Sequence, residues 1–303
     1  MTKCRTYAVA NQKGGVAKTT TVASLATALH GFGKRVLAVD LDPQACLTFS
    51  LGLDPENLEL SIHDVLLGRV SARMVAQPVP EGPDVLPSTI DLAGCEAQLL
   101  MRTGREYTLR HALDEIRENY DVILLDCAPT LGVLTINALT AADEVIVPMQ
   151  CETLSHRGVG QLLDTVNDVQ RLTNPALHVM GVLPTLFDGR TLHTRAVLAD
   201  IALRYGLDVL DPPIPRSIRF AEAPAVGQTV MSTAKRTPGA EAYRVLARRI
   251  AGIAEPTLSP PPAAEPAAST EPSPVQTVSL DDPEPPPVAP SMSYVTGSGG
   301  EQR

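Results

Sequence analysis

The chain has 303 residues, of which 44% are hydrophobic, and it carries a formal net charge of −9. This composition suits one large α/β domain or two small ones and excludes a fibrous or wholly disordered protein. No apolar run approaches the roughly 20 residues of a membrane span, and no charged-then-apolar leader opens the chain, so we expect a cytoplasmic protein. Five scattered cysteines predict reduced, mostly buried thiols.

The negative charge is concentrated near the C-terminus. Seven acids and one base lie beyond residue 254, so that stretch holds −6 of the net −9 and leaves −3 on residues 1–254. A near-neutral body can carry a local basic face, and arginines are frequent in its C-terminal half. The acidic total therefore does not exclude a nucleic acid as a partner.

Short apolar stretches alternate with helical patterns up to residue 254. Strands are predicted where the runs are short, β-branched and bounded by polar or turn residues, over 7–10, 35–40, 122–125, 144–148 and 179–183. Helices are predicted between them, over 19–32, 108–118, 132–141, 155–172 and 192–204. This alternation predicts an α/β fold with a mainly parallel, doubly wound sheet, helices on both faces, and ligands at the carboxyl ends of the strands.

The composition changes abruptly at the end of this pattern. Residues 256–303 are rich in Pro, Ala, Ser and Glu and cannot bury enough apolar surface to offset the entropy of ordering. We therefore expect a folded domain over 1–255 and a disordered tail with polyproline II character over 256–303. The tail either acts as a passive solubilising segment or docks a partner.

The strongest chemical signal is NQKGGVAKTT at residues 11–20, between the first predicted strand and the first predicted helix. The adjacent glycines Gly14 and Gly15 let backbone N–H groups turn toward an anion, and the helix that follows offers its positive N-terminal end. Lys18 adds a cation, and the Thr19 hydroxyl is placed to ligate Mg²⁺. The segment therefore predicts a phosphate cradle.

The cradle departs from the ordinary Walker pattern GxxxxGK[ST], because Gln12 and Ala17 occupy its glycine positions and Lys13 precedes the paired glycines. It resembles the deviant Walker ATPases of the ParA/MinD group, whose usual motif is KGGVGKTT. The resemblance implies ATP and Mg²⁺ as cofactors, and a Lys13 that reaches across a dimer to the partner's nucleotide. It implies nucleotide contacts from Lys13, Gly14, Gly15, Val16, Ala17, Lys18, Thr19 and Thr20. If position 17 needs a positive φ, its alanine costs about 1 kcal/mol.

Acidic residues follow two further predicted strands. Asp40 and Asp42 end the second strand, and period-two spacing points both in one direction, where they can face the γ-phosphate. Asp126 ends an apolar stretch like a Walker B strand. An aspartate in such a place is often only a helix cap, but the order of the three elements is specific. The resemblance implies that Asp42 positions the attacking water and that Asp126 holds the Mg²⁺ shell through water.

The resemblance extends over roughly residues 5–254 and is closest to Soj-type members. CAPTLG at 127–132 resembles switch II, and IPRSIR at 214–219 implies that Pro215 and Ser217 border the adenine. It also implies nonspecific contacts to DNA phosphates from Arg216, Arg219, Lys235 and Arg236. Solvated surface charge is the alternative interpretation of these four residues.

The function implied is that of a ParA-like, nucleoid-associated ATPase for chromosome or plasmid segregation. ATP would permit a sandwich dimer that binds DNA nonspecifically, and a ParB-like partner would stimulate hydrolysis. The alternative is a MinD-like or cargo-positioning ATPase that acts on a membrane or protein matrix. We expect no membrane partner, because the amphipathic stretch 241–253 is interpreted as a surface helix packed on the domain.

Overall fold

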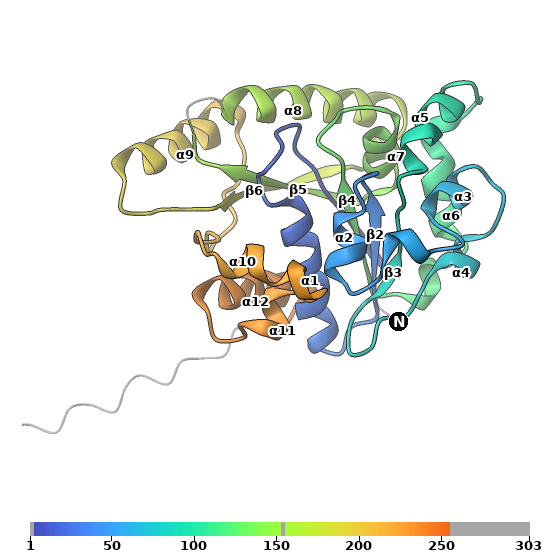
Figure 1. Ribbon diagram of the computed structural model, residues 1–303. Helices are drawn as coiled ribbons and strands as arrows, with labels where there is room; N and C mark the ends of the chain where they lie inside the picture. Colours follow the sequence, from blue (N-terminus) through green and yellow to red (C-terminus); the bar gives the residue numbers. More distant parts are fainter. Residues whose placement is uncertain (1–2, 153–154, 255–303) are drawn as a thin grey trace, which may run out of the picture. The chain divides into compact units, whose positions relative to one another are not determined.

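The computed structural model describes residues 3–152 and 155–254, so the tail predicted over 256–303 lies outside the described residues. Six strands form one parallel sheet in the order β3-β2-β4-β1-β5-β6 (Figure 1). The strands are β1 (Arg5–Val9), β2 (Val36–Leu41), β3 (Asp84–Leu86), β4 (Val122–Cys127), β5 (Glu144–Gln150) and β6 (His178–Thr185). The doubly wound α/β fold predicted from the alternation of elements is confirmed.

Helices connect the strands. The longer ones are α1 (Lys18–Gly31), α5 (Leu92–Leu100), α6 (Thr108–Asp114), α7 (Val133–Ala141), α8 (Ser155–Leu172), α9 (Leu192–Tyr205) and α12 (Pro238–Ala251). Shorter ones are α2 (Cys46–Ser50), α3 (Ile62–Leu66), α4 (Ala72–Val75), α10 (Arg219–Glu222) and α11 (Val230–Thr233). Single 3₁₀ turns are η1 (Pro55–Asn57), η2 (Arg105–Tyr107), η3 (Arg117–Asn119) and η4 (Pro224–Val226).

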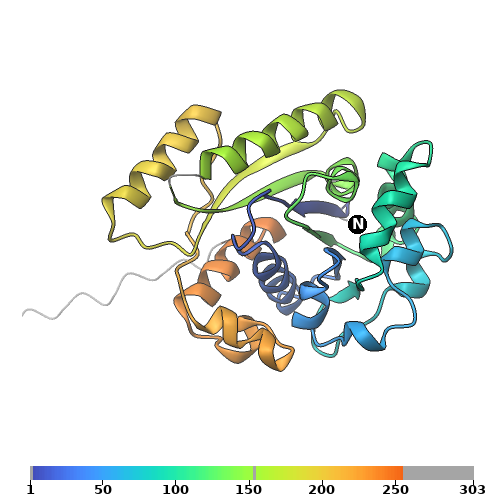
Figure 2. The same ribbon diagram turned by 45° about the horizontal axis from the view of Figure 1, so that its top comes forward.

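The central strands bury both of their faces. In β1, Tyr7 and Val9 point into one core cluster, whereas Ala8 points into another on the opposite face of the sheet. The first cluster packs under α1 and α12, and the second packs under α5 to α8, so that two helical layers enclose the sheet (Figure 2). Successive side chains of a strand alternate between the two faces of the sheet, and here both faces are buried. These strands therefore appear in the sequence as continuous apolar runs.

The predicted elements correspond to observed ones within a few residues, but the sequence patterns indicated neither the short helices α10 and α11 nor the elements of one longer region. Between residues 42 and 107 the structure has the edge strand β3 and the helices α2 to α5, which the sequence patterns did not indicate. β3 has only three residues, and the first helices there have four or five, too short for a period to show. Helix α6 ends at Asp114, and the rest of the helix predicted to 118 is a turn that includes η3.

Helix α12 contains most of the amphipathic stretch predicted as a surface helix. Its apolar face, which includes Tyr243, Leu246 and Ile250, is buried against α1. The hydroxyl groups of Tyr243 and Thr21 of α1 lie 3.0 Å apart and form a hydrogen bond. Within the described residues, no helix has the length and apolarity needed to cross a membrane.

Candidate nucleotide site

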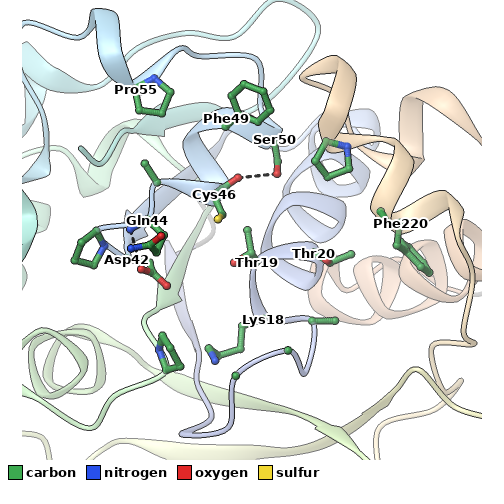
Figure 3. Close-up of a pocket in the computed structure, with 18 of the residues that line it drawn as sticks. Lys18, Thr19, Thr20, Asp42, Gln44, Cys46, Phe49, Ser50, Pro55 and Phe220 are labelled. Atoms are coloured by element: carbon green, nitrogen blue, oxygen red, sulfur yellow. Dashed lines mark hydrogen bonds between the residues drawn. The ribbon is translucent and has the colours of Figure 1, made fainter. Parts of the chain in front are cut away.

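A hollow of about 1090 Å³ opens at the carboxyl ends of β1 and β2, between the start of α1, the segment around α2, and α10 (Figure 3). Its lining includes most of the predicted cradle, namely Gly14, Gly15, Ala17, Lys18, Thr19 and Thr20, together with Asp42 from the end of β2. In Figure 3, Lys18, Thr19 and Asp42 surround one space. The sheet thus brings together residues that are distant in sequence, at the edge where parallel α/β sheets bind ligands.

Two residues with a left-handed backbone conformation shape the cradle. Gly15 has φ of 72°, which glycine adopts without strain, and Ala17 has φ of 65° and ψ of 34° immediately before α1. The sequence left open whether position 17 needs a positive φ, and the structure shows that it does. Two other non-glycine residues with positive φ, Ala45 and Leu186, also line the hollow. Such strain concentrates at ligand sites.

Lys18 is the buried cation of the cradle. Its residue is only 7% exposed, and its ammonium group donates a hydrogen bond of 3.1 Å to the carbonyl oxygen of Lys13. Burial lowers the pKa of Lys18, while Asp126 and Asp42 oppose that shift by favouring the charged form. A buried ammonium with one hydrogen-bond acceptor among the described residues is suited to receive an anion in the space in front of it.

Asp40 and Asp126 are register partners on β2 and β4 and are fully buried. Asp40 accepts hydrogen bonds from the backbone N–H and hydroxyl of Thr48 and from the N–H of Asp42. Burial raises the pKa of Asp40 to about 6, with these hydrogen bonds opposing the shift. Asp40 does not line the hollow, so of the two acids expected to face the γ-phosphate only Asp42 reaches this space.

Neither carboxylate oxygen of Asp126 has a hydrogen-bond partner among the described residues, although both are buried. Burial first, and the Asp40 carboxylate second, raise the pKa of Asp126 well above its usual range. An orphaned buried carboxylate next to the start of α1 fits a site for Mg²⁺, whose charge would offset this cost. Thr19, the other predicted metal ligand, lines the adjoining hollow.

Two cradle residues that were predicted to contact the nucleotide, Lys13 and Val16, do not line the hollow. Lys13 lies outside the lining of the hollow, and its ammonium group forms an ion pair of 2.5 Å with Glu152, just after β5. Val16 is buried, and its carbonyl oxygen accepts a hydrogen bond from the Thr185 hydroxyl at the end of β6. Lys13 is thus held at the rim by its own chain, and Val16 fixes the loop to the sheet.

The far side of the hollow is apolar. Ser217 lines it as predicted, whereas Pro215 lines a separate hollow. The sequence predicted no role at the site for the other lining residues on this side, Leu186, Ile214, Phe220, Ala221, Pro224 and Tyr243. Apolar residues in loops and short helices carry no period that would reveal a binding role, and the period of α12 indicates only that Tyr243 is buried. This wall suits the flat face of a purine.

All five cysteines are free thiols, and only Cys46, which lines the hollow, is exposed. The prediction that most of the thiols are buried is confirmed, and none of the five is paired in a disulfide. Burial raises the pKa of the thiols most strongly at Cys127, which follows Asp126 on β4. These cysteines therefore stay protonated and act as small apolar residues.

The predicted basic residues do not share one hollow. Arg216 lines a hollow of about 660 Å³ together with Arg190 and Arg195, at the loop after β6 and the start of α9. Arg219 begins α10 and forms an ion pair of 2.8 Å with Glu222. The exposed residues Lys235 and Arg236 lie in the turn between α11 and α12.

The parallel sheet and the anion cradle that leads into α1 define a P-loop nucleotide-binding protein. Residues 4–179 match the family model described as "AAA domain". Sporulation initiation inhibitor protein Soj of Bacillus subtilis is 42% identical over 245 residues, which cover 80% of this chain and 97% of Soj. Chromosome partitioning protein ParA of Caulobacter vibrioides is 42% identical, over 81% of this chain and 93% of that protein.

A solved structure described as cobyrinic acid a,c-diamide synthase from Mycobacterium smegmatis, with bound ATP analog and magnesium, is also similar. It is 56% identical, has a TM-score of 0.74, and covers 82% of this chain and 94% of that one. The chain belongs to the ParA/Soj family of P-loop ATPases, which confirms the resemblance seen in its motifs.

Proposed function

We propose that this P-loop ATPase is a ParA-like segregation protein that forms an ATP-dependent sandwich dimer, binds DNA nonspecifically, and is stimulated by a ParB-like partner. The observation that carries the ATPase part is the meeting of Lys18, Thr19 and Asp42 around one hollow beside the orphaned carboxylate of Asp126. Relatives named as partitioning proteins support the biological role. The nucleoid in the cytoplasm is the proposed location.

Each residue of the site has a chemical task. The backbone N–H groups at Gly14 and Gly15 and the Lys18 ammonium hold the ATP phosphates, and the apolar wall near Phe220 holds the base. Thr19 and Asp126 would hold Mg²⁺, which would supply positive charge to neutralise the phosphates. Asp42 lines the hollow just after β2, where its carboxylate would orient the attacking water, and its backbone N–H donates a hydrogen bond of 3.1 Å to Asp40.

Lys13 has the task of joining two copies. Its ammonium group lies at the rim rather than in the lining of its own hollow, which leaves it able to serve a nucleotide bound by a second chain. To do so it must leave Glu152, an exposed pair that costs little to break. The hypothesis therefore needs only a side-chain movement at Lys13 before the sandwich forms.

The arginine-lined hollow is the proposed centre of the DNA-binding face. Arg190, Arg195 and Arg216 converge there from the β6–α9 connection and the segment before α10. Arg190 forms an ion pair of 3.7 Å with Asp188, which lines the same hollow, whereas Arg195 and Arg216 have no ion pair within the described ranges. Guanidinium groups that are not neutralised attract phosphates whatever the base sequence. Lys235 and Arg236 are proposed to extend this face, and Arg219 contributes less because Glu222 neutralises it.

Salt-dependent binding tests this surface. Arg195→Ala and Arg216→Ala should weaken ATP-dependent binding equally on unrelated DNA sequences, and each lost phosphate contact should reduce the salt slope by about one unit. The matched control is Arg171→Ala, which removes an exposed arginine paired with Asp168 on α8. ATP affinity is measured in parallel, because Arg216 is adjacent to Ser217. Unchanged salt slopes in both test variants would place the DNA face elsewhere.

The 56% identical synthase structure supports a second candidate, an ATP-dependent ligase that forms an amide. In that reaction a substrate carboxylate, not water, attacks the γ-phosphate, so phosphate release would require cobyrinic acid and a nitrogen donor. Turnover with ATP and DNA alone distinguishes hydrolysis from this reaction. A positioning ATPase that uses a membrane or protein matrix is the remaining alternative, and it predicts no DNA binding in any nucleotide state.

A further inference from the structure

Glu96, on α5, has a buried carboxylate oxygen that the proposed chemistry does not use. Oε1 of Glu96 is shielded from solvent and has no hydrogen-bond partner among the described residues. A buried carboxylate oxygen without a donor is costly, and native structures contain few of them. Such an atom calls for a partner that another state of the protein supplies.

This oxygen lies close to the segment that resembles switch II. A methyl group placed on Gly132 would lie 2.7 Å from Oε1 of Glu96, so the carboxylate touches the backbone at the start of α7. The first-turn N–H groups of a helix lack intrahelical acceptors and attract negative charge. Pro129, three residues earlier in the same segment, lines the nucleotide hollow. The segment 129–132 thus spans the distance from the hollow to Glu96.

The beginning of α5 is connected to the other side of the hollow. The N–H of Ser88 donates a hydrogen bond of 2.9 Å to the Thr48 hydroxyl, which itself donates to Asp40. Ile90, just before α5, lines the hollow and is 69% exposed. The segment that leads into α5 therefore contacts the segment after Asp42, and α5 itself contacts the segment after Asp126 through Glu96.

We propose that Glu96 is a positioning residue for ATP hydrolysis. When residues 129–132 close on bound ATP, a backbone N–H at the start of α7 donates to Oε1 of Glu96 and fixes that segment for the chemical step. The proposal rests on ATP hydrolysis at the site described above. It assigns Glu96 no contact with ATP, so it predicts an effect on kcat with little effect on ATP affinity.

The test compares Glu96→Ala and Glu96→Gln in the full chain. We expect Glu96→Ala to lower kcat about tenfold or more while the Kd for ATP stays within about twofold, because the lost bond forms only in the closed state. Glu96→Gln keeps an acceptor oxygen and should recover much of the loss. The nucleotide-free melting temperature should not fall in Glu96→Ala, since the removed oxygen has no partner in that state. Glu118→Gln, an exposed acid near the opposite ends of the strands, is the control.

A second variant tests the contact itself. Gly132 has a φ of −79°, so Gly132→Ala is tolerated by the backbone, but its methyl group would displace the Glu96 carboxylate. If Glu96 acts through this contact, Gly132→Ala should lower kcat, and Glu96→Ala should add no further loss in the double variant.

The outcomes are distinguishable. The positioning role would be overturned if the kcat losses of Gly132→Ala and Glu96→Ala multiply in the double variant. A wild-type kcat in Glu96→Ala would overturn it as well. If Glu96→Ala lowers the ATP affinity as much as it lowers kcat, or lowers the melting temperature of the nucleotide-free protein, Glu96 stabilises the fold instead. A parent protein that binds ATP and does not hydrolyse it would refute the proposed function and, with it, the reaction that Glu96 is proposed to position.

Discussion

Replacing Ala17 by glycine should stabilise the protein, although alanine-to-glycine changes usually do the opposite. Ala17 has φ of 65° and ψ of 34°, the left-handed region in which a Cβ crowds the following carbonyl oxygen. The residues before Ala17 form a loop that is neither strand nor helix, and α1 begins at Lys18, directly after Ala17. The phosphate cradle needs this turn, so the chain holds an alanine in a conformation that suits glycine.

The size of the effect follows from two opposing contributions. The left-handed conformation costs an L-residue roughly 1–2 kcal/mol, which glycine relieves. Glycine also has more conformational freedom than alanine in the unfolded chain, which reduces this stabilisation by about 0.4–1 kcal/mol. The net gain for Ala17→Gly should be about 0.5–1 kcal/mol. For a domain of this size that corresponds to a rise in melting temperature of about 1–4 °C.

Thermal and urea unfolding without nucleotide measure this change. The matched control is Ala97→Gly, the same substitution at an exposed position inside α5, which should cost about 1 kcal/mol because glycine weakens a helix. The two variants should therefore shift stability in opposite directions. If Ala17→Gly destabilises the protein as much as Ala97→Gly, the cradle does not store strain at Ala17 and the reasoning fails.

Three further substitutions test the roles of Lys13, Asp42 and Asp121. Lys13→Ala should spare ATP binding by the single chain and prevent the ATP-dependent dimer in size-exclusion with light scattering, and a variant that still dimerises contradicts the role of Lys13. Asp42→Ala should slow hydrolysis by ~10²-fold or more and accumulate the dimer, unless Asp42 also holds the phosphates, in which case it stays monomeric. Asp121→Asn should lower the urea midpoint at pH 7, because hydrogen bonds and charge from Arg35 lower the pKa of Asp121 in the folded state. That contribution is complete above about pH 4 and is lost as the pH falls through the lowered pKa, so parent and variant should converge in acid, and a constant difference would exclude this cause.

The sequence predicted the cradle well because its signals are local. Adjacent glycines before a lysine and two threonines need only the strand on one side and the helix on the other to form an anion site, and α1 begins at Lys18 as this requires. The predicted α/β fold follows from strands that are apolar on both faces. The short elements between residues 42 and 107 escaped prediction, because three- to five-residue segments take their structure from the packing around them.

Residue chemistry and spacing thus determined by themselves that the chain is an α/β protein with a phosphate cradle, and which residues flank it. Only the tertiary structure decided the different fates of two aspartates that are two residues apart. The end of β2 turns Asp40 into a buried contact with Thr48 and leaves Asp42 at the hollow. Likewise, only packing brought Glu152 to Lys13 and Glu96 to Gly132. Contacts of this kind join residues far apart in the chain, and their geometry depends on how the layers pack, which no local pattern records.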